Sequence, residues 1–276
     1  MKRLVVTADD FGLCPEVNAA VRRAHREGVL TCASLMVGAE TAAEAAAIAR
    51  DDNLAVGLHL VLVDGRPVLP PARVPDLVDA RGRFRSGPAA LGFRLAASRR
   101  VREQVAAECA AQVGAFLETG LAIDHVNAHH HLHVHPYVLG VVLALARRHR
   151  IPAVRVPWQP GVPPAAQAVA AAAMAPWAAR ARSRLREAGI ATNDALFGLH
   201  ETGAMTEAAW LAVVPRVRPG LTEVYCHPAT ATRGVLRETM AGYRHADELA
   251  ALVSPAVGAA LDRAGIRRVS FAEARR

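Results

Sequence analysis

A histidine-rich stretch is the part of the chain whose residue types could most readily do chemistry. The segment DHVNAHHHLHVHP, residues 124–136, places six histidines within eleven positions. Continued as a strand, it would put alternate histidines on one face, namely His129, His131, His133 and His135. Neighbours on such a face are about 6 to 7 Å apart, whereas a zinc–nitrogen bond is about 2 Å long. One ion can therefore take at most two adjacent histidines, and the others line a pocket or cap the next helix.

Further metal ligands can come from two other parts of the chain. Asp9 and Asp10 follow an apolar run, and His59 interrupts the apolar run VGLHLVL. A lone histidine in an apolar strand is ordinarily a core residue. His59 becomes a candidate ligand because other potential metal ligands occur at the ends of neighbouring strands. Consecutive strand residues face opposite ways, so one carboxylate could bind metal while the other acts as a base. One carboxylate with two imidazoles leaves coordination positions for water and substrate, as hydrolysis requires.

A proton donor for a leaving group is the other requirement of such a reaction. The candidate is His227, in the sequence VYCHP near the C-terminal end of the chain. A histidine before proline at the end of a strand is as often structural as functional, and both interpretations stay open at this point.

Alternating strands and helices must position these residues. Strand patterns occur at 3–10, 31–39, 54–62, 122–130, 151–158, 221–228 and 266–271, and helix patterns occur at 14–28, 41–52, 101–119, 136–150, 208–217 and 245–265. This alternation predicts an α/β fold with a parallel sheet, either a barrel or a doubly wound sheet. In both, functional residues gather at the C-terminal ends of strands. The polar residues at those ends are Asp9, Asp10, His59, Asn127 to His131, Arg155 and His227.

The chain is expected to form a single domain over residues 1–276, because 276 residues with 52% hydrophobic side chains can bury a large core. Insertions are expected near 64–100, which includes a Pro-rich excursion, and near 160–190, which is rich in alanine. The second insertion is a helix packed on the barrel or, alternatively, a lid or surface-docking helix for an apolar substrate.

Charge and cysteine content restrict the partners and the compartment. The net charge of +8 comes from scattered arginines, with Lys2 the only lysine, and no basic stripe with interleaved aromatics suggests nucleic acid. The four cysteines form no CxxC pair, which indicates a reducing compartment. The first apolar run is too short for a signal peptide, and no apolar run reaches the roughly 18 residues of a membrane span. We expect a cytoplasmic protein, with peripheral contact at the inner face of the membrane as a weaker expectation.

Several motifs together resemble the YdjC-type carbohydrate deacetylases. In chain order they are TADDFG (7–12) followed by Asn18, SLMV (34–37), GLHLVL (57–62), NAHHHLHVHP (127–136) and YCHPA (225–229). Two longer segments, 57–84 and 124–136, resemble more narrowly the hopanoid-biosynthesis-associated branch of that family.

The resemblance implies a fold, an activity and a site. The fold is a distorted TIM-like (β/α) barrel of the NodB/YdjC type, and the activity is hydrolysis of the N-acetyl group of an amino sugar, which this branch carries on a hopanoid lipid. One divalent metal ion is implied, Mg²⁺ or Zn²⁺, with Mn²⁺ or Co²⁺ as alternatives. Position by position, the ligands would be Asp10, His59 and His129, Asp9 would be the general base and His227 the acid.

Four further residues bear on this site. His131 matches a family histidine beside the pocket. Many family members have aspartate at the position of Asn127, so a neutral amide replaces a carboxylate that would orient a metal ligand. Arg155 could bind sugar hydroxyls or a phosphate, with an ion pair sealing the barrel as the alternative. Trp158 could stack on a sugar face or simply pack.

Two other functions remain as alternatives. The same ligand set could hydrolyse a phosphoester or a cyclic amide, or the protein could be a non-catalytic, histidine-rich metal binder. The partner expected under the first interpretation is an N-acetylated amino sugar, free or lipid-linked, and a homodimer is left open.

Overall fold

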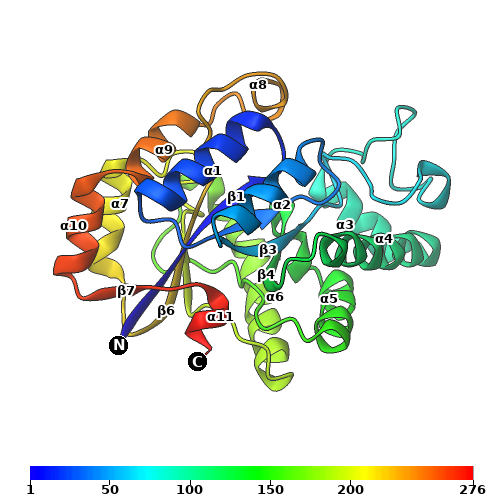
Figure 1. Ribbon diagram of the computed structural model, residues 1–276. Helices are drawn as coiled ribbons and strands as arrows, with labels where there is room; N and C mark the ends of the chain where they lie inside the picture. Colours follow the sequence, from blue (N-terminus) through cyan, green and yellow to red (C-terminus); the bar gives the residue numbers. More distant parts are fainter. Residues whose placement is uncertain (276) are drawn as a thin grey trace.

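The computed structural model describes residues 1–275 and contains one sheet of parallel strands surrounded by helices (Figure 1). The strands are β1 (Lys2–Phe11), β2 (Cys32–Leu35), β3 (Ala55–Leu60), β4 (Ile123–Ala128), β5 (Ala195–Phe197), β6 (Gly220–Cys226) and β7 (Ile266–Arg268). Six of them lie in the order β4-β3-β2-β1-β6-β5. The seventh, β7, pairs with the first residues of β1, whereas β2 pairs with its last ones. β5 is the one strand that the sequence patterns did not predict.

The two edges of the sheet are joined, so that it curves into a barrel. Val126 of β4 donates a hydrogen bond to Ala153 O, and Val154 donates one to Ala191 O, both at 3.0 Å. The chain then continues from Ala191 into β5, which pairs with β6. This arrangement confirms the predicted α/β fold with a distorted barrel. The strand expected at 151–158 consists of isolated bridges only, since Pro152 and Pro157 have no N–H to donate.

Helices cover the outside of the barrel (Figure 1). They are α1 (Pro15–Glu27), α2 (Ala42–Asp51), α3 (Pro88–Ala97), α4 (Arg99–Glu118), α5 (Pro136–His149), α6 (Ala168–Glu187), α7 (Glu207–Val213), α8 (Val235–Thr239), α9 (His245–Leu252), α10 (Pro255–Arg263) and α11 (Phe271–Ala274). Most follow the expected ranges. The single helical region expected at 245–265 is divided into α9 and α10, because Pro255 begins a new helix.

The first helix shows how the sequence dictates these elements. Pro15 occupies the first turn of α1, where no intrahelical N–H is needed. Val17, Ala20, Val21 and Ala24 recur at helical spacing, and all four are buried against the sheet. The helix ends at Gly28, where a Cβ would lie 2.2 Å from the carbonyl oxygen of Leu252.

Both insertions pack on this framework. The chain after β3 is held to α4 by Glu108, whose carboxylate accepts hydrogen bonds from the backbone of Val68 and Leu69 at 2.8 and 3.1 Å. The Ala-rich insertion forms α6, which continues through Pro176. The helix expected in this second insertion is therefore present.

The strand β4 ends earlier than expected. Residues 129–134 form a short 3-10 segment after Ala128, and His130 and His131 have φ values of +53° and +55°. Both are in the left-handed region, which non-glycine residues seldom adopt. The expectation that alternate histidines from 129 to 135 share one strand face is therefore wrong, because the backbone turns at the end of the barrel to begin α5.

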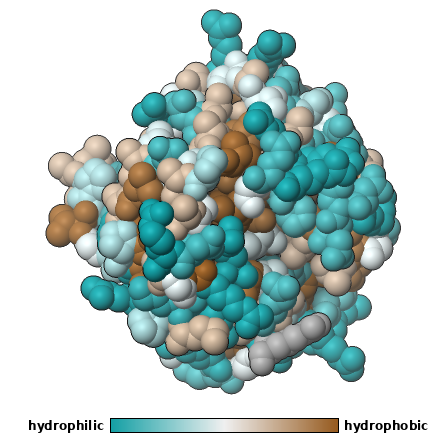
Figure 2. All heavy atoms as spheres, turned by 60° about the vertical axis from the view of Figure 1, so that its left-hand side comes forward, coloured by the Kyte–Doolittle hydropathy of each residue, from teal (hydrophilic) through white to brown (hydrophobic). Residues whose placement is uncertain are grey.

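Polar side chains predominate on the face seen in Figure 2, where apolar side chains form small separate patches. The last helix, α11, lies close to the start of β1 (Figure 1), and Arg3 donates a hydrogen bond to the carbonyl of Ala274. Within residues 1–275, no helix combines the length and the hydropathy that a bilayer span requires.

Candidate metal centre and active site

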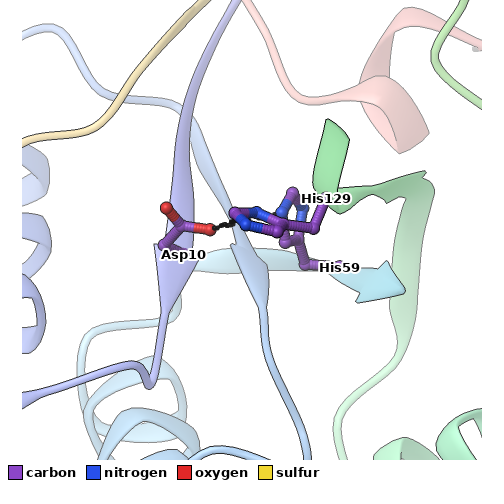
Figure 3. Close-up of side chains that lie close together, drawn as sticks. All are labelled: Asp10, His59 and His129. Atoms are coloured by element: carbon purple, nitrogen blue, oxygen red, sulfur yellow. Dashed lines mark ion pairs between the residues drawn. The ribbon is translucent and has the colours of Figure 1, made fainter. Parts of the chain in front are cut away.

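Three of the predicted ligands converge at the C-terminal end of the barrel (Figure 3). Asp10 comes from β1, His59 from β3 and His129 from the residue after β4. Asp10 Oδ1 lies 3.3 Å from His59 Nε2 and 3.3 Å from His129 Nδ1. One ligand atom from each residue falls within 4.8 Å of the others. The arrangement supplies one oxygen and two nitrogen donors on one side of a common point.

Two of these three residues, Asp10 and His59, carry buried polar atoms that no other protein group uses. Both carboxylate oxygens of Asp10 and His59 Nε2 are buried without a hydrogen-bond partner. Buried polar atoms are nearly always paired, so these three atoms are explained if they bind a cation. The donor set thus fits a divalent metal.

A β-bulge lets both aspartates face the site. The pairing of β1 with β2 shifts between Ala8 and Phe11, and Asp10 has a φ of +62°. The bulge breaks the alternation of the strand, so Asp9 and Asp10 both point to the end of the barrel. The sequence analysis expected the two aspartates to face opposite ways, whereas the bulge brings both to the same end of the barrel within β1.

Asn127 links a metal ligand to the predicted base. Its Oδ1 lies 2.7 Å from His59 Nδ1, and its Nδ2 donates to Asp9 Oδ1 at 3.0 Å. Because Oδ1 can only accept, His59 must carry its proton on Nδ1, which leaves Nε2 free to face Asp10. The amide thus does what a carboxylate at this position was expected to do, namely orient a ligand.

Asp9 is paired with a buried arginine. Arg155 Nη1 lies 2.5 Å from Asp9 Oδ2, and Nη2 lies 3.0 Å from Oδ1. The same guanidinium contacts Glu223 Oε1 at 2.7 and 2.9 Å. Burial raises the pKa of Asp9, but the charge of Arg155 lowers it more, so the carboxyl stays ionised well below its ordinary range. The expectation that Arg155 binds substrate is corrected, because its side chain is fully buried beneath the pocket. Its role is instead the ion pair inside the barrel that was the alternative interpretation.

His227 faces the same space from the end of β6. Its peptide is held on both sides by α9: Glu248 Oε2 accepts from its N–H at 2.5 Å, and His245 Nδ1 lies 2.6 Å from its carbonyl oxygen. Burial lowers the pKa of His227 to about 4, although the charges of Asp10 and Asp9 act in the opposite direction. The imidazole is therefore neutral near pH 7 before it receives a proton.

A pocket of about 940 Å³ opens above these residues. Asp9, His59, His129 and His227 lie at its floor. One wall is apolar and is formed by α6 and the chain before it, through Pro163, Ala168, Ala171, Ala172, Met174 and Ala175. The rest of the lining is mixed and includes polar side chains such as Gln159, Thr202 and Glu238, so the pocket is wide, with one apolar wall.

The two remaining predicted residues line this pocket. His131 lies 5.6 Å, between ring centroids, from Tyr225, and it is not part of the group of potential ligands. Trp158 is 41% exposed, with the guanidinium of Arg182 5.0 Å from its ring centroid. Both positions are compatible with contact to a substrate.

Sequence reasoning missed several residues of the site. Glu223 and Ser34 lie inside apolar strands, and Glu248 and His245 lie on a helix far along the chain. Their one signal is a charged or polar residue within an otherwise apolar segment, as in LTEVYC. That signal was used for His59 and could have been used for Glu223.

Comparisons with known proteins point to one family. A family model described as YdjC-like protein matches residues 3–263. A carbohydrate deacetylase of Geobacillus stearothermophilus is 32% identical over 272 residues, which cover 98% of this chain and 96% of that one. A carbohydrate deacetylase of Brevibacillus brevis is 45% identical over 157 residues, which cover 56% of this chain and 60% of that protein.

A solved structure is similar over the full length. It is a candidate cellobiose-phosphate cleavage protein of Enterococcus faecalis V583, 27% identical, with a TM-score of 0.79 and coverage of 99% of this chain and 98% of that one. The barrel and both insertions thus lie within a fold known from experiment.

Proposed function

The chain belongs to the YdjC-like family, and on that premise we propose that it is a metal-dependent hydrolase that removes the N-acetyl group from an N-acetylated amino sugar. The observation that carries the proposal is the convergence of Asp10, His59 and His129 on one point, beside Asp9 and His227 at the floor of one pocket. A metal site, a base and an acid are what metal-assisted amide hydrolysis requires.

Asp10, His59 and His129 would hold the metal. Two imidazole nitrogens with one carboxylate oxygen favour Zn²⁺ or Co²⁺ over Mg²⁺, which prefers oxygen ligands throughout. When bound, a divalent cation supplies Lewis acidity, which activates water and offsets negative charge on a carbonyl oxygen.

Asp9 and His227 would move the protons. Asp9 is ionised at neutral pH and can accept a proton from the attacking water. Because its pKa is held low by Arg155, it keeps that proton weakly, which favours onward transfer. His227, which is neutral in the resting site, would receive this proton from Asp9 and give it to the departing amine nitrogen, and the charges of the two neighbouring aspartates favour its protonated form during that step.

The lining of the pocket favours an amide over a phosphoester. Within residues 1–275, none of the side chains that line the pocket is a lysine or an arginine. Phosphate groups are normally bound by these side chains, whereas a neutral N-acetyl group needs neither. The buried Arg155 is already paired with Asp9 and Glu223.

The narrower form of the proposal is an acetylated sugar linked to a hopanoid lipid. The apolar wall supports it, because the alanine and methionine side chains of α6 offer no hydrogen bonds to further sugar rings. The chain from 156 to 179 contains no charged residue, and Val162 and Val169 in it are 91% and 83% exposed. Such an exposed apolar segment, in a chain whose net charge is +8, suits peripheral contact with an anionic membrane.

The activity is tested by release of acetate from an N-acetylglucosaminyl hopanoid and from N-acetylated chitooligosaccharides. Chelator-stripped protein should be inactive, and Zn²⁺ or Co²⁺ should restore release more effectively than Mg²⁺. Release of phosphate from matched sugar phosphates is measured alongside. Silence on both acetylated substrates with every metal would overturn the proposal, and phosphate release would replace it with the phosphoester alternative.

Lipid linkage is tested by placing a charge on the apolar wall. Ala171→Glu places a carboxylate on the lining face of α6, whereas Ala173→Glu places the same charge at an exposed residue outside the lining. Ala171→Glu should lower kcat/KM for the lipid-linked substrate at least tenfold and leave the soluble chitooligosaccharide within about twofold. Equal effects on both substrates would contradict a lipid in this groove.

Membrane contact is tested with anionic vesicles. Val162→Asp and Val169→Asp should abolish flotation of the protein with phosphatidylglycerol vesicles, and Leu211→Asp, on α7, is the matched control at another partly exposed apolar residue. Unchanged flotation of Val162→Asp and Val169→Asp would contradict membrane docking through the segment 156–179.

A further inference from the structure

A chain of buried hydrogen bonds runs from the active site into the interior of the barrel. Asn127 Nδ2 donates to Ser34 Oγ at 2.8 Å, in addition to its bond to Asp9. Ser34 Oγ lies 3.0 Å from His125 Nε2, and His125 Nδ1 lies 3.0 Å from Asp124 Oδ2. These side chains are between 0 and 4% exposed. The network thus extends well beyond the residues that touch the pocket.

The donors and acceptors fix the direction of each bond. The carboxylate of Asp124 can only accept, so His125 must carry a proton on Nδ1. A neutral His125 then accepts at Nε2, and the Ser34 hydroxyl donates to it. This leaves the oxygen of Ser34 as an acceptor for Asn127. Every bond has one donor and one acceptor when His125 is the neutral Nδ1–H tautomer.

The far end of the network is anchored to the C-terminal helix. Asp124 accepts hydrogen bonds from the backbone of Phe271 and Ala272, at 3.2 and 2.8 Å, at the start of α11. The ring of Phe271 packs against His125 with 4.8 Å between centroids. Asp124 is therefore fixed by backbone groups, which gives the network a rigid end.

A metal ion is a poorer explanation of the same cluster. Cys32, Asp124 and His125 also lie within ligand distance of one another. However, Cys32 Sγ already has a polar partner, Thr7 Oγ1, at 3.3 Å. The carboxylate oxygens of Asp124 and both nitrogens of His125 are already engaged.

We propose that Ser34, His125 and Asp124 are positioning residues that hold the Asn127 amide in the one orientation that keeps Nε2 of His59 free for metal. A flipped amide would turn its oxygen to the Asp9 carboxylate and its N–H₂ to His59 Nδ1. The proton of His59 would then move to Nε2, which faces the other two ligands, and metal binding would be blocked.

A second anchor is needed because Asp9 changes during turnover. This step rests on the proposed function, in which Asp9 takes a proton from water and is for that moment a weaker acceptor for Asn127. Ser34 does not change its charge, and His125 and Asp124 hold its hydroxyl. The Ser34 bond therefore keeps the amide in place while Asp9 is protonated.

The first test is the tautomer of two histidines in the metal-free wild-type protein, measured by ¹⁵N NMR of the imidazole nitrogens. Both His125 and His59 are expected as neutral Nδ1–H forms. A doubly protonated or Nε2–H form of His125 at pH 7 would overturn the proposal without any variant or substrate.

The second test compares Ser34→Ala with Cys32→Ala. The two residues are buried on the same strand, two positions apart and on the same face, but only Ser34 bonds to Asn127. In Ser34→Ala the metal-free protein should show a mixture of His59 tautomers, Co²⁺ affinity should fall about tenfold, and kcat/KM should fall with it. Cys32→Ala should stay within twofold of wild type, and Ser34→Thr, which keeps the hydroxyl, should restore the wild-type tautomer.

The outcomes separate this proposal from the proposed function. Wild-type tautomers and Co²⁺ affinity in Ser34→Ala would overturn the positioning role, whatever the substrate. If instead the tautomer and Co²⁺ affinity change as expected while no acetylated sugar is hydrolysed, the positioning role stands and the deacetylase proposal fails.

Discussion

Arg155 donates two hydrogen bonds to Asp9, from Nη1 to Oδ2 at 2.5 Å and from Nη2 to Oδ1 at 3.0 Å, and both side chains are buried. The guanidinium also contacts Glu223, so one cation lies between two carboxylates inside the barrel. A bidentate pair fixes the plane of the Asp9 carboxylate as well as its charge. The carboxylate that we propose as the base is therefore oriented before substrate binds.

The role of Asp9 can be separated from that of the ion pair by changing each of the two carboxylates. Asp9→Asn should lower kcat at least about 100-fold, because the base is lost, while Co²⁺ affinity changes little. Glu223→Gln also weakens the pairing of Arg155 but leaves the base, so kcat should fall less than tenfold. Both variants should lose stability, by up to about 3 to 5 kcal/mol for a broken buried pair.

Steady-state kinetics, Co²⁺ titration and thermal unfolding of the two variants check this prediction. If Asp9→Asn kept more than a tenth of the wild-type rate, the base would have to be another group. An equal loss of kcat in Glu223→Gln would show that the ion pair, rather than the base, limits the reaction.

Metal affinity should depend on pH through His129. Burial lowers the pKa of His129, but the negative charge of Asp10, 3.3 Å away, raises it more, so the net pKa lies above its ordinary value in the metal-free protein. A raised pKa means that a proton competes with the metal already near neutral pH. Affinity should therefore be highest on the alkaline side and fall up to about tenfold per unit as the pH drops below this pKa.

Calorimetric titration with Zn²⁺ or Co²⁺ between pH 5.5 and 8.5 measures this dependence. The matched control is His131→Gln, because His131 lines the pocket without belonging to the ligand group, and it should keep the wild-type profile. His129→Gln should bind weakly at every pH. An affinity that does not change across the range would contradict ligation by His129.

The convergence of the three proposed metal ligands could be predicted from the sequence because strand ends are local features. Asp10 and His59 each follow an apolar run that any strand pattern reveals, and parallel strands bring their C-terminal ends together whatever the details. The position of Arg155 was predicted in the same way, but its environment was not. Whether an arginine at a strand end faces solvent or another carboxylate depends on Asp9 and Glu223, which are 146 and 68 residues away.

Backbone departures from regular structure were also not predictable from the pattern. A period of two cannot show the bulge at Asp10, nor the left-handed turn at His130 and His131 that ends β4. Both are tertiary effects: non-glycine residues adopt such conformations when surrounding contacts outweigh their cost. The polar network through Ser34 and His125 was missed for a similar reason, since 91 residues separate Ser34 from His125.

Replacing the Asn127 amide by a carboxylate should shift the pH profile. Asn127→Asp would place a second carboxyl group beside Asp9 Oδ1, where Asn127 Nδ2 now donates at 3.0 Å. Like charges at this distance raise the pKa of the pair, so the acid limb of kcat/KM should move to higher pH. His59 would gain a stronger acceptor at Nδ1, so metal affinity should rise.

The profile of kcat/KM from pH 4 to 9, together with Co²⁺ titration, checks both effects. The reference for the first is Ser34→Ala, which removes a bond to Asn127 without adding a charge and so should leave the acid limb in place. An Asn127→Asp profile superimposable on that of wild type would show that Asn127 does not influence Asp9.

The hydrogen bond from the His227 N–H to Glu248 should affect the catalytic rate more than the stability of the fold. Both oxygens of Glu248 accept backbone N–H groups, from Met205 at 2.9 Å and from His227 at 2.5 Å. In Glu248→Gln, one N–H would face the amide N–H₂ instead, and His227 would lose its fixed position. A displacement of a reacting group by about 1 Å can cost on the order of 100-fold in rate, so kcat should fall at least tenfold with little change in Co²⁺ affinity.

Glu108→Gln is the matched control for Glu248→Gln. Glu108 is also fully buried, and its two oxygens accept the N–H groups of Val68 and Leu69, but it holds the insertion after β3 rather than a catalytic residue. Both variants should lose about 1 to 3 kcal/mol of stability for an unsatisfied buried donor, measured by denaturant unfolding. The proposal for Glu248 requires that kcat falls in Glu248→Gln and not in Glu108→Gln. Parallel losses of kcat and stability in both variants would show that Glu248 contributes to folding only.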